Sequence, residues 1–299
     1  MRSLPFAGRL LVLLALVLGV ATVASPGIWW ALDAATGSTH RFSFPRAYDR
    51  VLEVLAALAL VRWRGWLGFP TWSALGLGQP ARRHDVWIGI AIALAGMVVL
   101  VGVMYAADAL RFFWRYPFEK GVHKALLGAA AAFIVGAGEE ILFRGILLGG
   151  LMQHLGRGTA VIWTTAVYAV VHFLRGGKQA GDVGMLSGVE RLASAFAPLA
   201  DPGILPGLVG FVLLGLVLAY ARLRTGALYL AIGLHIGWVL TLRAGRVIMD
   251  FPLVPGLLWG ERRPPLVSGV AGWAAIGTTF VALAWMLRRR TSVTPPGRA

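Results

Sequence analysis

Two adjacent glutamates, Glu139 and Glu140, lie inside a long apolar stretch of the sequence, from about residue 125 to 152. Each ionisable residue inside a membrane costs roughly 2.5–3.5 kcal/mol on insertion scales, so its presence there indicates a function and a partner. Arg144 is the first candidate partner, because residues four apart lie on the same face of a helix. The simpler interpretation is an ion pair that neutralises itself inside a helix bundle.

Two histidines lie in other apolar stretches, His172 in the fifth and His235 in the seventh. At 1.5 Å per residue, Glu140, His172 and His235 lie roughly 18, 20 and 13 Å from the same side of the membrane. All three could therefore share a layer near the midplane. A carboxylate and two imidazoles at one depth suit proton transfer or metal binding. A single histidine in such a helix would more often form an interhelical hydrogen bond.

Two kinds of chemistry follow from this set. A buried glutamate near a histidine can take a proton from water, and the second imidazole can stabilise a developing oxyanion. Arg144 would keep one of the two carboxylates ionised. Alternatively, Glu140, His172 and His235 could hold a divalent ion such as zinc, with one position left for water. The spacing does not match the His-Glu-x-x-His signature of zinc peptidases.

The elements that must position these residues are apolar helices. Of the 299 residues, 58% are hydrophobic and only 14% are charged. Several apolar stretches approach or exceed the roughly 18 residues that indicate a membrane span. We therefore predict an all-α, polytopic membrane helix bundle of about eight transmembrane helices. The predicted spans are 10–32, 47–61, 86–107, 125–152, 159–174, 203–223, 227–242 and 267–287.

The loops carry most of the positive charge, and the chain has a net charge of +15. Arginines between apolar stretches set membrane topology, and the clusters Arg2/Arg9 and Arg288–Arg290 favour both termini inside. Stacking aromatics interleaved with lysine and arginine are lacking, so we expect no nucleic-acid partner. The absence of cysteine excludes disulfides and thiolate catalysis. The long loop 175–202 is predicted to form an amphipathic surface helix within 183–199.

The first apolar stretch, from residue 10 to 32, has features of a secretory signal, with small residues at 21–25. Apolar sequence continues beyond them, which favours a retained, signal-anchor-like helix. We divide the chain into three parts. They are the N-terminal helices and connector (1–120), a catalytic core (121–245), and a proline-rich loop with the last helix and a basic tail (246–299).

At these polar residues the sequence resembles the CaaX-protease and bacteriocin-processing (CPBP) family of intramembrane proteases, which includes the Ras-converting type of CaaX prenyl endopeptidase. The motifs of that family are Glu-Glu-x-x-x-Arg, Phe-x-x-x-His and His-x-x-x-Asn/Asp. Here they correspond, in order, to residues 139–144 (Glu-Glu-Ile-Leu-Phe-Arg), 168–172 (Tyr-Ala-Val-Val-His) and 235–239 (His-Ile-Gly-Trp-Val). The resemblance covers about residues 126–242, and three ordered motifs make it fairly specific.

The resemblance implies an endopeptidase of the bacterial inner membrane that cleaves a membrane-associated or exported protein or peptide. Its partners would be this substrate and membrane lipids, and prenylated CaaX proteins are the best-known substrates of the family. Glu140 and His172 would activate the water, Glu139 and Arg144 would support the first motif, and His235 would stabilise the oxyanion. Family members are discussed both as metalloproteases and as glutamate proteases without metal. Zinc and no cofactor therefore both remain open.

The third motif departs from the family pattern, because Val239 stands where the family has Asn or Asp. A valine side chain cannot donate a hydrogen bond to an oxyanion. Trp238, with Tyr168 as a second aromatic group, could take over that support. A chain that lacks such a donor to the oxyanion would instead be a non-catalytic scaffold or an immunity protein of the same fold. A transporter with a proton relay is the third alternative, and the absence of a visible inverted repeat argues against it.

Overall fold

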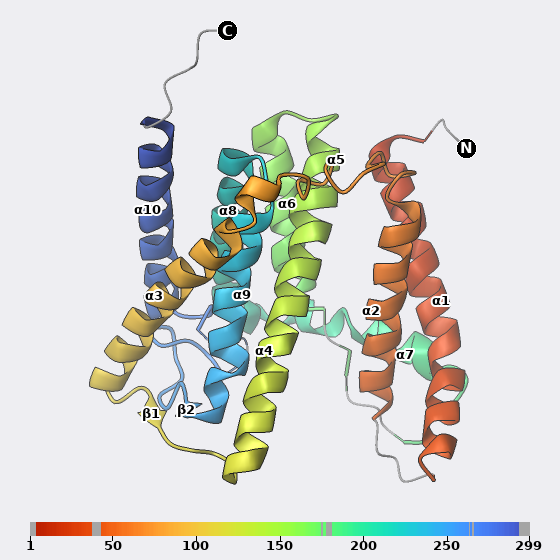
Figure 1. The fold of residues 1–299 in the computed structure, drawn as a ribbon. Helices are drawn as coiled ribbons and strands as arrows, with labels where there is room; N and C mark the ends of the chain where they lie inside the picture. The colour runs from red at the N-terminus through yellow and green to blue at the C-terminus, as the bar shows by residue number, and fades with distance from the viewer. Residues whose placement is uncertain are drawn as a thin grey trace, which may run out of the picture. The chain divides into compact units, whose positions relative to one another are not determined.

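The computed structural model describes residues 4–37, 43–174, 176–177, 181–262, 264 and 266–292. Three parts of the predictions therefore lie outside the described residues: Arg2, Arg175 at the start of the predicted loop 175–202, and the tail after Ser292. The chain divides into two units, each described by itself (Figure 1). Unit 1 comprises Met1–Thr71 and Val170–Ile204, and unit 2 comprises Trp72–Ala169 and Leu205–Ala299.

Unit 1 is built on two long helices, α1 (Phe6–Ala35) and α2 (Phe44–Trp63), which pack side by side (Figure 1). A short helix, α7 (Ser187–Ser194), packs against α1 so closely that a Cβ atom at Gly188 would lie 1.9 Å from the Thr22 carbonyl oxygen. Two turns of 3-10 helix follow, η3 (Ala197–Ala200) and η4 (Pro202–Ile204). The helix predicted within 183–199 is thus confirmed as α7.

Unit 2 contains the other helices and the only β-strands among the described residues. The helices are α3 (Asp85–Ala106), α4 (Phe118–Glu140), α5 (Leu148–Met152), α6 (Arg157–Val171, whose end belongs to unit 1), α8 (Leu205–Thr225), α9 (Tyr229–Arg243) and α10 (Val270–Ser292). Three short helical segments join them: η1 (Pro80–Arg82), the π-helix η2 (Ile141–Leu147) and η5 (Gly245–Val247). α9 lies at the centre and packs against α3, α4 and α8. Its residues from Tyr229 to Trp238 are all buried, as expected of a helix that is apolar on every side.

A small antiparallel sheet closes one end of unit 2, where β1 (Arg111–Phe112) pairs with β2 (Met249–Asp250) (Figure 1). Arg111 pairs with Asp250 in the register, and Asp250 also forms an ion pair of 3.1 Å with Arg115. The sequence predicted only a connector here, because two-residue strands leave no hydrophobic alternation to recognise. The sheet joins the chain before α4 to the chain after α9.

The membrane class of the protein is supported by five helical segments of the described chain that are long and apolar enough to cross a membrane. These are Phe6–Ala35, Pro80–Ala106, Phe118–Met152, Pro202–Thr225 and Val270–Arg289. The other three predicted spans are helices, but they are not confirmed as spans. α6 and α9 have 15 residues each, which makes about 22 Å at 1.5 Å per residue, whereas the hydrocarbon core is about 30 Å thick. α2 carries five charged residues: Arg46, Asp49, Arg50, Glu53 and Arg62.

The contact between α3 and α9 depends on glycine. A Cβ atom at Gly233 would lie 2.0 Å from the Val86 carbonyl oxygen, and one at Gly89 would lie 2.5 Å from the Leu230 carbonyl oxygen. The two backbones therefore touch, as at the small-residue interfaces of membrane helices. This contact fixes the position of α9, which carries His235.

We expect Gly233→Ala to destabilise unit 2 by about 1–3 kcal/mol, because the added methyl group overpacks this contact. The midpoint of thermal unfolding in detergent should fall accordingly. Gly102→Ala, on the same helix α3 as Gly89, has nothing within 4 Å of the added atom and should leave the midpoint unchanged or raised. Equal midpoints for Gly233→Ala and the unmodified protein would contradict the described contact.

Candidate active site

The two glutamates lie at the end of α4, where the helix changes its geometry. Glu139 and Glu140 are the last residues of α4, and the π-helix η2 follows at once. A π-helical turn is wider than an α-helical one and is frequently found at functional sites. Arg144 lies inside η2 and reaches back to Glu140. The sequence predicted the pair but not the wide turn, because the apolar residues of η2 suit an α-helix equally well.

Glu140 is held by two partners through one oxygen atom. Its Oε1 accepts a hydrogen bond from Arg144 Nη1 at 2.8 Å and lies 2.9 Å from His235 Nδ1. The side chains of Glu140 and Arg144 are completely buried, and His235 is 3% exposed. Buried charges are tolerated when they are paired and hydrogen-bonded. With Glu140 ionised, Nδ1 of His235 is the donor of this bond, so Nε2 is left as the basic nitrogen of the neutral ring.

Arg144 is fixed by two further contacts. Its Nη2 donates a hydrogen bond to the Gly215 carbonyl oxygen at 3.2 Å, which ties η2 to α8. Its guanidinium carbon lies 4.3 Å from the centre of the Tyr168 ring, in a cation–π contact. A Cβ atom at Gly215 would lie 2.9 Å from Thr165 Cγ2, so this position admits no side chain without a shift. Gly215 and Thr165 carry no functional signal in the sequence, because glycines and threonines are common at helix contacts.

Glu139 differs from its neighbour in being accessible. Its side chain is 30% exposed, although the Oε2 atom, which lies 3.8 Å from Nε2 of His235, is itself buried. One imidazole therefore faces both carboxylates, with Nδ1 towards Glu140 and Nε2 towards Glu139. Glu140 is held in an ion pair with Arg144, whereas Glu139 lies beside Nε2, the basic nitrogen of His235.

Two of the predicted residues in unit 2 are buried aromatics. Tyr168 is fully buried and meets both Phe143 and His235 edge to face, with ring centres 5.1 and 6.3 Å apart. Trp238, one helical turn after His235 in α9, is 5% exposed. Its indole Nε1 has no hydrogen-bond partner in the described part of the chain. A buried donor without a partner costs free energy, so it is suited to an acceptor that a substrate brings.

The predicted residues thus fall into two groups. Glu139, Glu140, Arg144, Tyr168, His235 and Trp238 all lie in unit 2. His172 lies in unit 1, in the turn directly after the last residue of α6. Its part in the site stays a prediction.

A metal site needs ligands that point at one position. The described residues contain no group of three or more His, Cys, Asp or Glu side chains that could hold a metal ion. Of the predicted ligands, Glu140 and His235 do meet, but the oxygen that joins them is also bonded to the Arg144 guanidinium. A cation there would have to compete with this positive charge. The cluster as it stands does not fit a metal on Glu140, and we derive no step through one.

The comparison with protein families agrees with the motifs. Residues 121–241 match the family described as "Type II CAAX prenyl endopeptidase Rce1-like". The match includes all three motifs and extends from α4 into α9. Neither the curated proteins nor the solved structures contain a match to the chain. The resemblance predicted over 126–242 is thus confirmed at the level of this family, whose members are generally CAAX-type intramembrane proteases, and the apolar helices agree with an integral membrane protein.

Proposed function

We propose, from the type II CAAX prenyl endopeptidase match of residues 121–241, that this protein is an intramembrane endopeptidase. Its substrate would be a membrane-associated or exported protein or peptide. The observation that carries the proposal is His235, whose two ring nitrogens face Glu140 at 2.9 Å and Glu139 at 3.8 Å. A basic nitrogen beside an accessible carboxylate is what the activation of a water molecule requires.

In the mechanism we propose, Glu139 is the general base. It takes a proton from a water molecule that His235 Nε2 helps to orient, and the hydroxide attacks the carbonyl carbon of the peptide bond. The tetrahedral intermediate then collapses, the C–N bond breaks, and Glu139 returns the proton to the leaving amine. Glu140 stays ionised and holds Nδ1 of His235, as a positioning residue. This differs from the roles that the resemblance implied, because Glu140 is completely buried and already bonded to Arg144.

The oxyanion of the intermediate needs hydrogen-bond donors. Val239 has none, and Trp238 Nε1 is a buried donor whose position lies one turn from His235. We propose that Trp238 donates to the oxyanion in place of the Asn or Asp of the family. His172, about one turn further along the chain than Tyr168, is the second candidate donor. Removal of one such donor typically lowers kcat by about 10²–10³.

The test is cleavage of a membrane-peptide library by the purified protein in detergent. We expect His235→Ala to lower the rate of cleavage by roughly 10²–10⁴, and Trp238→Phe to lower kcat by about 10²–10³. Trp285→Phe, at an exposed position of α10, is the matched control and should cleave normally. Cleavage that His235→Ala leaves unchanged would come from a contaminant and would overturn the assignment.

One observation favours a second function, a non-catalytic scaffold or immunity protein of the same fold. Val239 lies one residue after Trp238 and supplies no donor. Under this alternative, the folded protein would cleave nothing, and Val239→Asn would create activity.

We also propose that the protein lies in a bacterial inner membrane with both termini in the cytoplasm, which reporter fusions at each end would test.

A further inference from the structure

A second polar site lies far from Glu139 and Glu140. A cavity of about 460 Å³ opens between the first half of α4 and the segment that joins α9 to η5. Its lining includes Tyr116, Lys124, Leu127, Gly128, Arg243 and Arg246. Lys124 is 16 residues before Glu140, which is about 24 Å along the helix. This basic pocket is therefore separate from the candidate active site.

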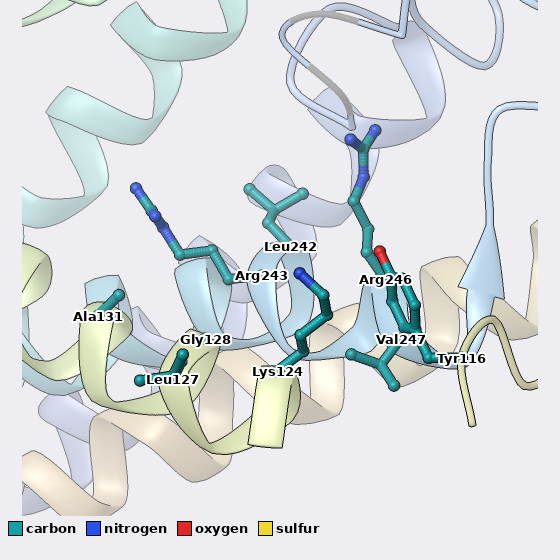
Figure 2. A pocket seen from close by; sticks show the side chains of 9 residues that line it. All are labelled: Tyr116, Lys124, Leu127, Gly128, Ala131, Leu242, Arg243, Arg246 and Val247. Carbon is teal, nitrogen blue, oxygen red and sulfur yellow. The ribbon is translucent and has the colours of Figure 1, made fainter. Parts of the chain in front are cut away.

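Three cationic side chains, those of Lys124, Arg243 and Arg246, line the basic pocket. Figure 2 shows the side chains of Lys124, Arg243 and Arg246 extending to the same side, with the ammonium of Lys124 between the two arginines in this view. Among the described residues, no Asp or Glu lines the pocket, and none forms an ion pair with Lys124 or Arg243. Three cations around one cavity attract an anion whose charge is distributed over several oxygens.

The backbone and the aromatic residues hold these cations in place. A Cβ atom at Gly128 would lie 3.1 Å from the backbone of Arg243 and Ala244, so α4 and the end of α9 meet at the floor of the pocket. Arg246 stacks 5.4 Å from the Phe251 ring centre, and Lys124 Nζ lies 5.1 Å from that of Tyr116. Arg243 also lies in the last turn of α9, where positive charge favours the helix dipole. The dipole does not account for Lys124, which belongs to another helix.

The surroundings of the basic pocket are those of a membrane surface. Trp114 and Phe118 stack with ring centres 5.7 Å apart, and both are exposed beside the start of the candidate span Phe118–Met152. Aromatic residues together with lysines and arginines mark the interface between membrane and water. Leu127 lines the pocket and is itself exposed, so apolar surface continues from the cations along α4. A lipid presents these two chemistries together, a charged headgroup and apolar chains.

We propose that the basic pocket binds the phosphodiester headgroup of an anionic phospholipid, with the acyl chains along the exposed apolar face of α4. The headgroup phosphate accepts hydrogen bonds from Lys124, Arg243 and Arg246. The lipid holds the start of α4 and the end of α9 together at one membrane surface, away from Glu140 and His235, which lie on the same two helices.

The test counts bound lipids by native mass spectrometry of the full chain in detergent. Phosphatidylglycerol is titrated against phosphatidylcholine. The unmodified protein should retain phosphatidylglycerol in preference. A cation near the membrane surface favours an anionic lipid by roughly fivefold, so the triple variant Lys124→Gln/Arg243→Gln/Arg246→Gln should lose affinity by about a hundredfold. The matched control removes the same charge at three exposed arginines of unit 2, Arg83→Gln/Arg157→Gln/Arg224→Gln, and should bind as before.

Several outcomes would overturn the proposal. Equal affinity of the pocket variant and the unmodified protein is one, and an equal loss in the charge-matched control is another. Binding of inorganic phosphate that prevents the retention of phosphatidylglycerol, with no preference for phosphatidylglycerol over phosphatidylcholine in its absence, would assign the pocket to free phosphate. Retention of an acidic peptide in preference to the lipid would assign it to a peptide. If the triple variant does not fold, Lys124→Gln should show a fivefold loss that Lys124→Arg restores, and equal affinities of these two variants would contradict the assignment.

Discussion

Replacing Glu139 by glutamine should abolish the proposed peptidase activity and leave the fold intact. The substitution keeps the shape of the side chain and removes the group that accepts a proton from water. General base catalysis contributes roughly 10²–10⁴ to the rate, so kcat should fall by that factor. Glu139 is 30% exposed and lies outside the buried ion pair, so the thermal midpoint should stay within about 2–4 °C of the unmodified protein.

The contrast with Glu140 makes this prediction specific. Glu140→Gln leaves the guanidinium of Arg144 buried without its carboxylate, so this variant should lose stability as well as activity. Both variants are compared in cleavage rate and in thermal midpoint. Full activity of Glu139→Gln, together with a stable but inactive Glu140→Gln, would reverse the two roles. The base would then be Glu140, as the resemblance to the family implied.

The second large effect concerns stability. Arg144→Met should destabilise unit 2 by about 3–5 kcal/mol, because it leaves Glu140 as a buried carboxylate with only His235 as its partner. Tyr168 and the Gly215 carbonyl would lose a contact in addition. The measurement is the midpoint of unfolding in detergent, without any substrate. Arg157→Met, at an exposed position, is the matched control and should change stability by no more than about 0.5 kcal/mol.

A double variant isolates the charge. Arg144→Met/Glu140→Gln removes both members of the pair, so no charge stays buried, and a large part of the stability should return. If the double variant is less stable than Arg144→Met by the full cost of Glu140→Gln, the two residues act independently. The ion pair would then not be what stabilises this part of the bundle.

The sequence predicted a helical membrane protein, the pairing of Glu140 with Arg144, and a layer shared by Glu140, His172 and His235. The structure is helical with apolar candidate spans, and it brings Arg144 and His235 to Glu140, whereas the part of His172 in the site stays a prediction. A charge in an apolar helix is costly and few partners can offset it, so such residues stand out in the sequence. The count of eight spans is not confirmed, since hydropathy does not distinguish a short buried helix such as α9 from one that crosses a membrane. A helix of 15 residues inside a bundle is as apolar as a span.

Other features had no signal in the sequence. The wide turn η2 depends on hydrogen bonds rather than on residue types, and Gly215 contributes a carbonyl group, which every residue has. The basic pocket joins Lys124 to Arg243 and Arg246, which are more than a hundred residues away in the sequence. In the sequence, lysines and arginines beside apolar stretches indicate only the topology of the membrane spans, not which of these residues meet. Only the packing of α4 on α9 brings them together.

The spacing of the ion pair has a consequence for the order of synthesis. Arg144 lies four residues after Glu140 in the same helical segment, whereas His235 follows 95 residues after Glu140. A chain is made from its N-terminus, so the segment Phe118–Met152 exists before α9. Glu140 is therefore neutralised within its own helix while the chain enters the membrane, and the histidine arrives later. Placing the arginine on a different helix would leave an unpaired carboxylate in the lipid during the time needed to synthesise the rest.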